Sequence, residues 1–213
     1  MKFLRRSLML VLCLALVACS QSVERGLRTT ELVQDNINSI TNNLNEIQRL
    51  ENAIQTDFET TLRQGDQDLS VFNKSDNPIM INVANRNKLL DQLQKASDTI
   101  EELNEEMVSQ LEKSDIPKDQ TKEIVELVAA MKQDLNVYTS DYKKNLELEK
   151  QTYQSIANPD TNYDNFFAVF NNIDVIMTNN QMNLEKVLGY FEKINAHLID
   201  FKVYLTNLKE SHS

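Results

Sequence analysis

Residues 166–208 read FFAVFNNIDVIMTNNQMNLEKVLGYFEKINAHLIDFKVYLTNL, and their apolar spacing decides the fold class. Alternating steps of four and three residues reach thirteen positions, twelve of them apolar: Phe166, Phe170, Ile173, Met177, Asn180, Leu184, Val187, Phe191, Ile194, Leu198, Phe201, Leu205 and Leu208. This spacing predicts an amphipathic helix. A flanking row widens the apolar face: Val169, Ile176, Tyr190 and Tyr204. We therefore expect this helix to pack against at least two others.

Three upstream segments carry the same spacing less strictly, and a proline falls at each break between segments. The breaks at 75–78, 114–117 and 158–161 place polar capping side chains beside these prolines, and Thr161 with Asp164 resembles a capping box. We predict an all-α fold, an elongated, coiled-coil-like antiparallel bundle of four helical segments at about 22–73, 79–114, 117–157 and 161–210. Three helices would result if the second and third segments continued through Pro117.

The composition agrees with long helices. The 213 residues include three glycines, three prolines and no tryptophan, so there is little of the turn chemistry that many strands require. Hydrophobic residues make up 41% of the chain, enough to form a buried core.

The N-terminus has the pattern of a secretory signal. Lys2, Arg5 and Arg6 precede an unbroken apolar stretch at residues 8–18, which is too short to span a bilayer as a helix. The end of this stretch together with the next residue, Leu16-Val17-Ala18-Cys19, resembles the lipobox of bacterial lipoproteins. That resemblance implies a signal peptide at residues 1–18, cleavage between Ala18 and Cys19, and a diacylglyceryl group on the Cys19 thiol. The alternatives are a plain secretory signal with Cys19 as a free thiol, or cleavage at nearby small residues.

Processing at Cys19 would change the chemistry of the mature chain, residues 19–213. Cys13 would leave with the signal peptide and Cys19 would carry the lipid, so no thiol would remain for a disulfide, a metal site or catalysis. Loss of three basic residues would leave 19 basic against 32 acidic residues, a net charge of about −13. Nucleic acid is therefore excluded as a partner, and anionic headgroups or teichoic-acid-like polymers would be repelled at long range.

Few side chains suggest chemistry, and we predict no catalytic, cofactor-binding or metal-binding residues. The only histidines are His197, expected to be partly buried and structural, and His212 in the tail. Carboxylates at 101–102 and 105–106 are expected to form a solvated acidic face. Asn180 is expected to fix helix register. Most tyrosines are assigned to packing, with Tyr163 the most exposed.

Residues 142–153 read YKKNLELEKQTY. This stretch, together with the lipobox and the acidic helical chain, resembles the YkyA-like cell-wall-binding lipoproteins of Gram-positive bacteria. The resemblance implies a helical lipoprotein on the outer face of the bacterial cytoplasmic membrane, without an established catalytic motif.

Three function classes are to be distinguished for such a chain. A lipid-anchored, non-enzymatic protein that binds the cell wall (peptidoglycan) or scaffolds the envelope needs only the anchor, the bundle and its surface. An adaptor that contacts another envelope protein belongs to the same class, because it needs the same three features. A solute-binding lipoprotein would need strands and glycines that this chain lacks, and an envelope hydrolase using paired carboxylates would need a cleft to hold them.

Overall fold

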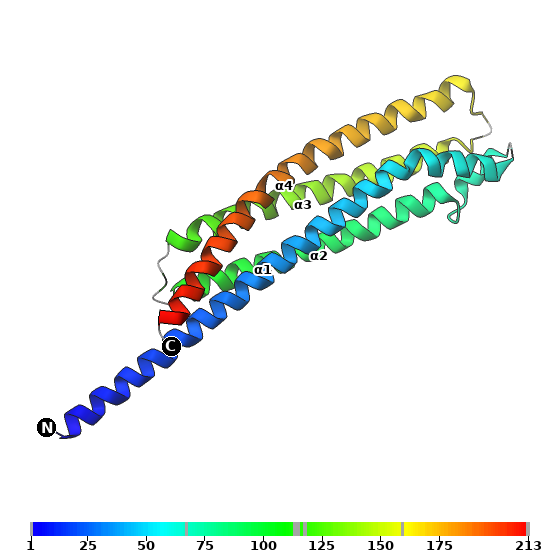
Figure 1. The fold of residues 1–213 in the computed structure, drawn as a ribbon. Helices are drawn as coiled ribbons and strands as arrows, with labels where there is room; N and C mark the ends of the chain where they lie inside the picture. Colours follow the sequence, from blue (N-terminus) through cyan, green and yellow to red (C-terminus); the bar gives the residue numbers. More distant parts are fainter. Residues whose placement is uncertain (1, 67, 113–115, 117–118, 159, 212–213) are drawn as a thin grey trace. The chain divides into compact units, whose positions relative to one another are not determined.

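The computed structural model describes residues 2–66, 68–112, 116, 119–158 and 160–211; side chains are described from Ser22 onward, apart from 110–115, 120, 163 and 165. These residues form four α-helices and one short 3₁₀ helix without any strand (Figure 1): α1 (Lys2–Gly65), η1 (Leu69–Asn73), α2 (Pro78–Glu112), α3 (Asp119–Ser155) and α4 (Tyr163–Ser211). The all-α prediction is confirmed. Because α2 ends at Glu112 and α3 begins at Asp119, the four-helix alternative is right and the three-helix one is wrong.

Each helix contributes to two compact units. The first comprises Met1–Asn38, Asp98–Lys132 and Gly189–Ser213, and the second comprises Ser39–Ser97 and Gln133–Leu188. Each unit therefore contains a segment of every α-helix.

In the first unit, cross-helix contacts establish the antiparallel order. Glu24 of α1 pairs with Lys209 of α4 at 3.3 Å, and Glu31 pairs with Lys202 at 2.9 Å, so residue numbers rise along one helix as they fall along the other. The unit's core is aliphatic with one phenylalanine, and it includes Val23, Val33, Ile37, Ile100, Met107, Ile124, Val128, Ile194, Leu198, Phe201 and Leu205. Burying each such side chain stabilises the fold by about 1.5–3 kcal/mol.

The second unit is antiparallel by the same criterion. Ser97 of α2 donates to Asn136 of α3 at 2.7 Å, and Asp91 pairs with Lys143 at 2.7 Å. Its core adds aromatic rings to the aliphatic side chains, and it includes Ile47, Phe58, Phe72, Ile79, Leu90, Leu93, Leu135, Tyr138, Tyr142, Tyr153, Ile173 and Leu184.

Both ends of α1 differ from the predicted 22–73. The helix begins at Lys2, because the leucines and alanines of residues 8–18 are themselves strong helix formers. It ends at Gly65, where Asp66 adopts the left-handed region with φ of 43°. Aspartate tolerates that region better than most residues. Asp68 then caps η1 by accepting a hydrogen bond from the Ser70 amide at 2.9 Å.

The helix starts confirm one capping prediction and correct another. Asn77 caps α2 as expected, since its Oδ1 accepts from the Met80 amide at 2.8 Å while Pro78 occupies the first position. Thr161 does not cap α4. Its hydroxyl donates to the Ser155 carbonyl at 3.1 Å, while the Asn162 carbonyl accepts from the Phe166 amide at 3.0 Å. The capping-box prediction was therefore wrong, because the Thr161 hydroxyl closes the preceding turn.

The predicted apolar seam of α4 is largely buried. Its buried members are Ile173, Asn180, Leu184, Val187, Ile194, Leu198, Phe201 and Leu205, together with flanking Val169 and Ile176. The other members are half-buried, at Phe166, Met177, Phe191 and Leu208, or exposed, at Phe170, where 39% of the surface is accessible. A groove between α4 and α1 opens beside Phe170, as described below.

Candidate functional site

The second unit buries an ion pair in its core. Arg86 of α2 and Glu149 of α3 are both fully buried, with 0% of either side chain exposed. Arg86 donates from Nη1 to Glu149 Oε2 at 2.8 Å and from Nη2 to Glu149 Oε1, so the pair is bidentate. A guanidinium matches a carboxylate in this geometry because its donors form a planar fork.

Further hydrogen bonds connect this pair to Tyr142 and α1. The Tyr142 hydroxyl accepts from Arg86 Nη1 at 3.2 Å and donates to Glu51 Oε1 at 2.6 Å. On the other side, Asn82 Oδ1 accepts from Arg86 Nε at 2.8 Å, and Asn82 Nδ2 donates to Asp57 Oδ2 at 2.7 Å. We call Arg86, Glu149, Tyr142, Glu51, Asn82 and Asp57 the buried network; it joins α1, α2 and α3.

The electrostatics of the buried network favour a fixed structure over proton transfer. Burial raises the pKa of Glu51, against the opposing effects of the Tyr142 hydrogen bond and of Arg86. Burial would lower the pKa of Arg86, but Glu149 more than compensates and raises it. Burial also raises the pKa of Tyr138, Tyr142 and Tyr153. The guanidinium therefore stays charged and these phenols stay neutral at neutral pH.

A groove of about 620 Å³ lies between α1 and α4 in the second unit. We call it the aromatic groove. Its apolar lining consists of Ile54, Phe58, Leu62, Tyr153, Phe166, Phe167, Phe170, Ile173 and Met177. Its polar lining consists of Glu51, Asn52, Gln55, Glu59 and Asp174. Glu51 therefore belongs both to the buried network and to the groove.

The rings of the aromatic groove contact one another around Phe58. The Phe58 centroid lies 5.2 Å from Phe170, 6.1 Å from Phe166 and 6.1 Å from Tyr153. Two rings remain accessible, since 46% of Phe167 and 39% of Phe170 are exposed. The Tyr153 ring is buried, and its hydroxyl completes no hydrogen bond of normal geometry. Burial, together with the neighbouring Glu149 carboxylate, raises the pKa of the Tyr153 hydroxyl.

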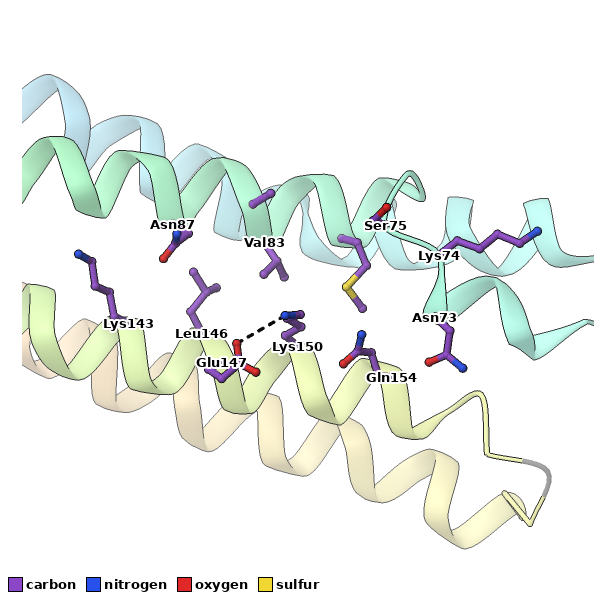
Figure 2. Close-up of a pocket in the computed structure, with 12 residues that line it drawn as sticks. Asn73, Lys74, Ser75, Val83, Asn87, Lys143, Leu146, Glu147, Lys150 and Gln154 are labelled. Carbon is purple, nitrogen blue, oxygen red and sulfur yellow. Dashed lines mark ion pairs between the residues drawn. The ribbon is translucent and has the colours of Figure 1, made fainter.

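A second hollow, of about 320 Å³, lies between α2 and α3 (Figure 2). Met80, Val83 and Leu146 supply its apolar lining. Lysines at 74, 143 and 150 also line it, and Lys150 pairs with Glu147 at 3.6 Å. Lys143 pairs with Asp91 at 2.7 Å and Glu147 itself lines the hollow, so carboxylates already offset much of this positive charge.

The structure places the sequence-derived candidates as follows. In the first unit, His197 Nε2 lies 3.5 Å from Glu123 Oε1 of α3. The His197 side chain is 36% exposed, in agreement with its predicted partial burial. Asn180 is buried and its Oδ1 accepts from Asn145 Nδ2 at 2.7 Å, so it contacts a second helix as a register-fixing residue would. The carboxylates at 101–102 and 105–106 are exposed, and Glu101 accepts from Lys132 at 2.7 Å.

Other candidates fall outside the described side chains. These are Ala18, Cys19, Tyr163 and His212. Among the residues whose side chains are described, no group of three or more His, Cys, Asp or Glu residues is arranged to hold a metal ion. Over the same part of the chain, every helix is too short or too polar to be a membrane span.

The comparisons with known proteins identify the family. A family profile named YkyA, with the description "Putative cell-wall binding lipoprotein", matches residues 23–203. The chain belongs to the YkyA family. The match includes parts of all four α-helices and therefore both units. Neither a curated protein nor a solved structure matches this YkyA-family chain.

Sequence reasoning missed the buried network, although the spacing carries a signal for it. In α2, Arg86 occupies the core position three residues after Val83 and four before Leu90. In α3, Glu149 occupies the corresponding position between Leu146 and Tyr153. Two opposite charges at core positions of neighbouring helices suggest a buried pair. The aromatic groove had no comparable signal, because Phe58, Phe166 and Phe170 fit the spacing of a closed core.

Proposed function

We propose that this protein is a non-enzymatic lipoprotein, anchored to the outer face of the bacterial cytoplasmic membrane, that binds the cell wall. The family match over residues 23–203 supports the proposal, because the description of that family names both a lipoprotein and cell-wall binding. The buried network is consistent with it, since a fixed ion pair sealed from solvent supports a binding scaffold better than acid–base chemistry.

The anchor is proposed to be a diacylglyceryl group on Cys19, after cleavage between Ala18 and Cys19. Two acyl chains give stable membrane attachment where a single chain gives only marginal binding. Replacing Cys19 by alanine should release the protein into the medium or leave an unprocessed precursor. Cys13→Ala is the matched control, since that thiol lies within the proposed signal peptide. Unchanged processing and membrane retention of the Cys19→Ala protein would refute the anchor.

Wall binding is tested by sedimentation of the detergent-solubilised full chain with purified sacculi, before and after removal of anionic polymers, across a salt series. We expect co-sedimentation that survives both treatments, because an acidic protein gains little from long-range attraction to an anionic wall. Failure to sediment with either preparation at any salt concentration would contradict the proposed wall binding.

A second candidate function, an adaptor for another envelope protein, is favoured by exposed apolar side chains on α4. In the second unit, Val175 and Met182 are 62% and 59% exposed. In the first unit, Ile199 and Val203 are also more than half exposed. A photocrosslinker attached at Met182→Cys should capture a discrete envelope protein if the adaptor function holds. The same reagent at Lys144→Cys, on an exposed polar part of α3, is the control.

A further inference from the structure

The aromatic groove combines one sign of charge with an accessible apolar surface. Its lining includes three carboxylates, on Glu51, Glu59 and Asp174, and it contains no lysine or arginine. Carboxylates around a partly enclosed apolar site raise the local concentration of cations and disfavour anions. The α2–α3 hollow differs, because it is lined by three lysines and Glu147, and two of those lysines are paired with carboxylates.

The exposed rings supply the second half of the recognition. Phe167 and Phe170 are only partly covered, and a ligand that covers them gains the free energy of removing apolar surface from water. An ammonium group near a ring face is further attracted by the ring's quadrupole. The occupant that fits both features is a cation carried on an aliphatic backbone or side chain.

We propose that the aromatic groove binds an amine-bearing peptide of the cell wall. Wall peptides combine small aliphatic residues with a diamino acid, whose side-chain amine stays free where no cross-link has formed. The ammonium would lie between Glu59 and Asp174, with Glu51 about 12 Å further along α1, while the aliphatic part covers Phe167 and Phe170. The groove volume of about 620 Å³ suits a ligand of a few residues. This inference rests on the proposed wall-binding function and names the wall component recognised.

The buried network makes one of these carboxylates a fixed part of the groove. Glu51 Oε1 accepts from the Tyr142 hydroxyl at 2.6 Å, and Tyr142 accepts from the fully buried Arg86. A carboxylate held in this way loses little conformational freedom when a ligand binds. Glu59 and Asp174 lie on α1 and α4, on opposite sides of the groove, and can approach the ammonium from both helices.

The test measures binding of two synthetic stem pentapeptides to the detergent-solubilised full chain by calorimetry. One peptide carries a free side-chain amine, and the other carries the same amine acetylated. We expect the free amine to bind about threefold tighter or more. Glu59→Gln combined with Asp174→Asn should abolish that difference. Phe167→Ala combined with Phe170→Ala should weaken both peptides, because it removes the accessible apolar surface.

Matched controls separate the groove from general effects. Glu105→Gln removes an exposed carboxylate from the first unit, and Met182→Ala removes an exposed apolar side chain of α4 outside the groove lining. Neither should change the affinity for either peptide. Circular dichroism of each variant should match that of the unaltered chain, since the substituted groove side chains are partly or fully exposed.

The sacculus assay of the proposed function keeps the two failures distinct. If the unaltered chain and the Phe167→Ala, Phe170→Ala double variant sediment equally well with sacculi, the wall contact lies outside the groove. That result overturns the groove proposal and leaves the proposed wall binding intact. Equal affinity for the free and acetylated peptides also overturns the groove proposal, in favour of an uncharged ligand such as a glycan. If the chain binds the amine peptide but no sacculi, the groove recognises peptides of another source and the wall assignment is overturned.

Discussion

The Arg86–Glu149 ion pair gives the sharpest test of what holds the second unit together. In Arg86→Met, the Glu149 carboxylate stays fully buried without its partner, and Asn82 and Tyr142 lose a donor. Breaking a buried pair from one side typically costs about 3–5 kcal/mol of the free energy of unfolding. An exposed pair such as Lys132–Glu101, removed by Lys132→Met, should cost less than about 1 kcal/mol.

Urea denaturation followed by circular dichroism measures both changes. With a denaturant slope of about 2 kcal/mol per molar urea, the loss in Arg86→Met corresponds to a midpoint lower by about 2 M. The double variant Arg86→Met with Glu149→Leu should recover much of that loss, because no unpaired charge remains in the core. In the double-mutant cycle, this recovery of stability would be measured as a coupling free energy of about 2–4 kcal/mol between the two residues.

Two results would refute this reasoning. A midpoint shift in Arg86→Met as small as that of Lys132→Met would mean that the Glu149 carboxylate reaches solvent or another cation. Strictly additive effects of the two single substitutions would mean that the residues contribute to stability independently, despite their bidentate contact.

Three further predictions use the same denaturation assay. Asn77→Ala should lower the free energy of unfolding by about 1–2 kcal/mol, because the Met80 amide loses its cap, whereas exposed Asn85→Ala should change it by less than about 0.5 kcal/mol. Asn180→Leu should raise the free energy of unfolding by about 1 kcal/mol, because apolar surface replaces a buried amide nitrogen that lacks a partner. An unchanged or lower value would show that the hydrogen bond with Asn145 outweighs the cost of that unpaired nitrogen. Glu51→Gln should stabilise the fold at neutral pH. Burial raises the Glu51 pKa, so the folded state binds the proton more tightly than the unfolded state does, and the advantage should shrink as pH falls through the carboxyl range; a pH-independent difference would contradict this.

The fold was predictable because its determinants are local. Apolar spacing in α4 and the proline-marked breaks specify helices and their ends within a few residues, as the cap at Asn77 illustrates. The predicted segment ran to residue 73, because apolar residues keep the same spacing beyond Gly65, where the sequence predicted at most a kink or fraying of the helix. The helix ends where Asp66 adopts the left-handed region with φ of 43°, and the tolerance of aspartate for that conformation is not encoded in apolar spacing.

The candidate site was less predictable because it depends on contacts between distant residues. Glu51 and Tyr142 are 91 positions apart in sequence, and no local pattern links them. Phe170 fits the apolar seam of α4 as well as Ile173 does, yet only Ile173 is buried. Burial at one position depends on how neighbouring helices pack around it, which the periodicity of one helix cannot specify.

The buried network and the aromatic groove depend on each other through Glu51. A buried ion pair stabilises a fold less than apolar packing of the same volume does, so we expect its main contribution here to be fixing which helix faces meet. The Tyr142–Glu51 hydrogen bond extends that constraint to the groove. Loss of Arg86 would remove the cation that favours the ionised form of Glu51, against the burial that opposes it. Arg86→Met should therefore reduce both the stability of the second unit and the preference of the groove for an ammonium group, whereas Lys132→Met should affect neither by much.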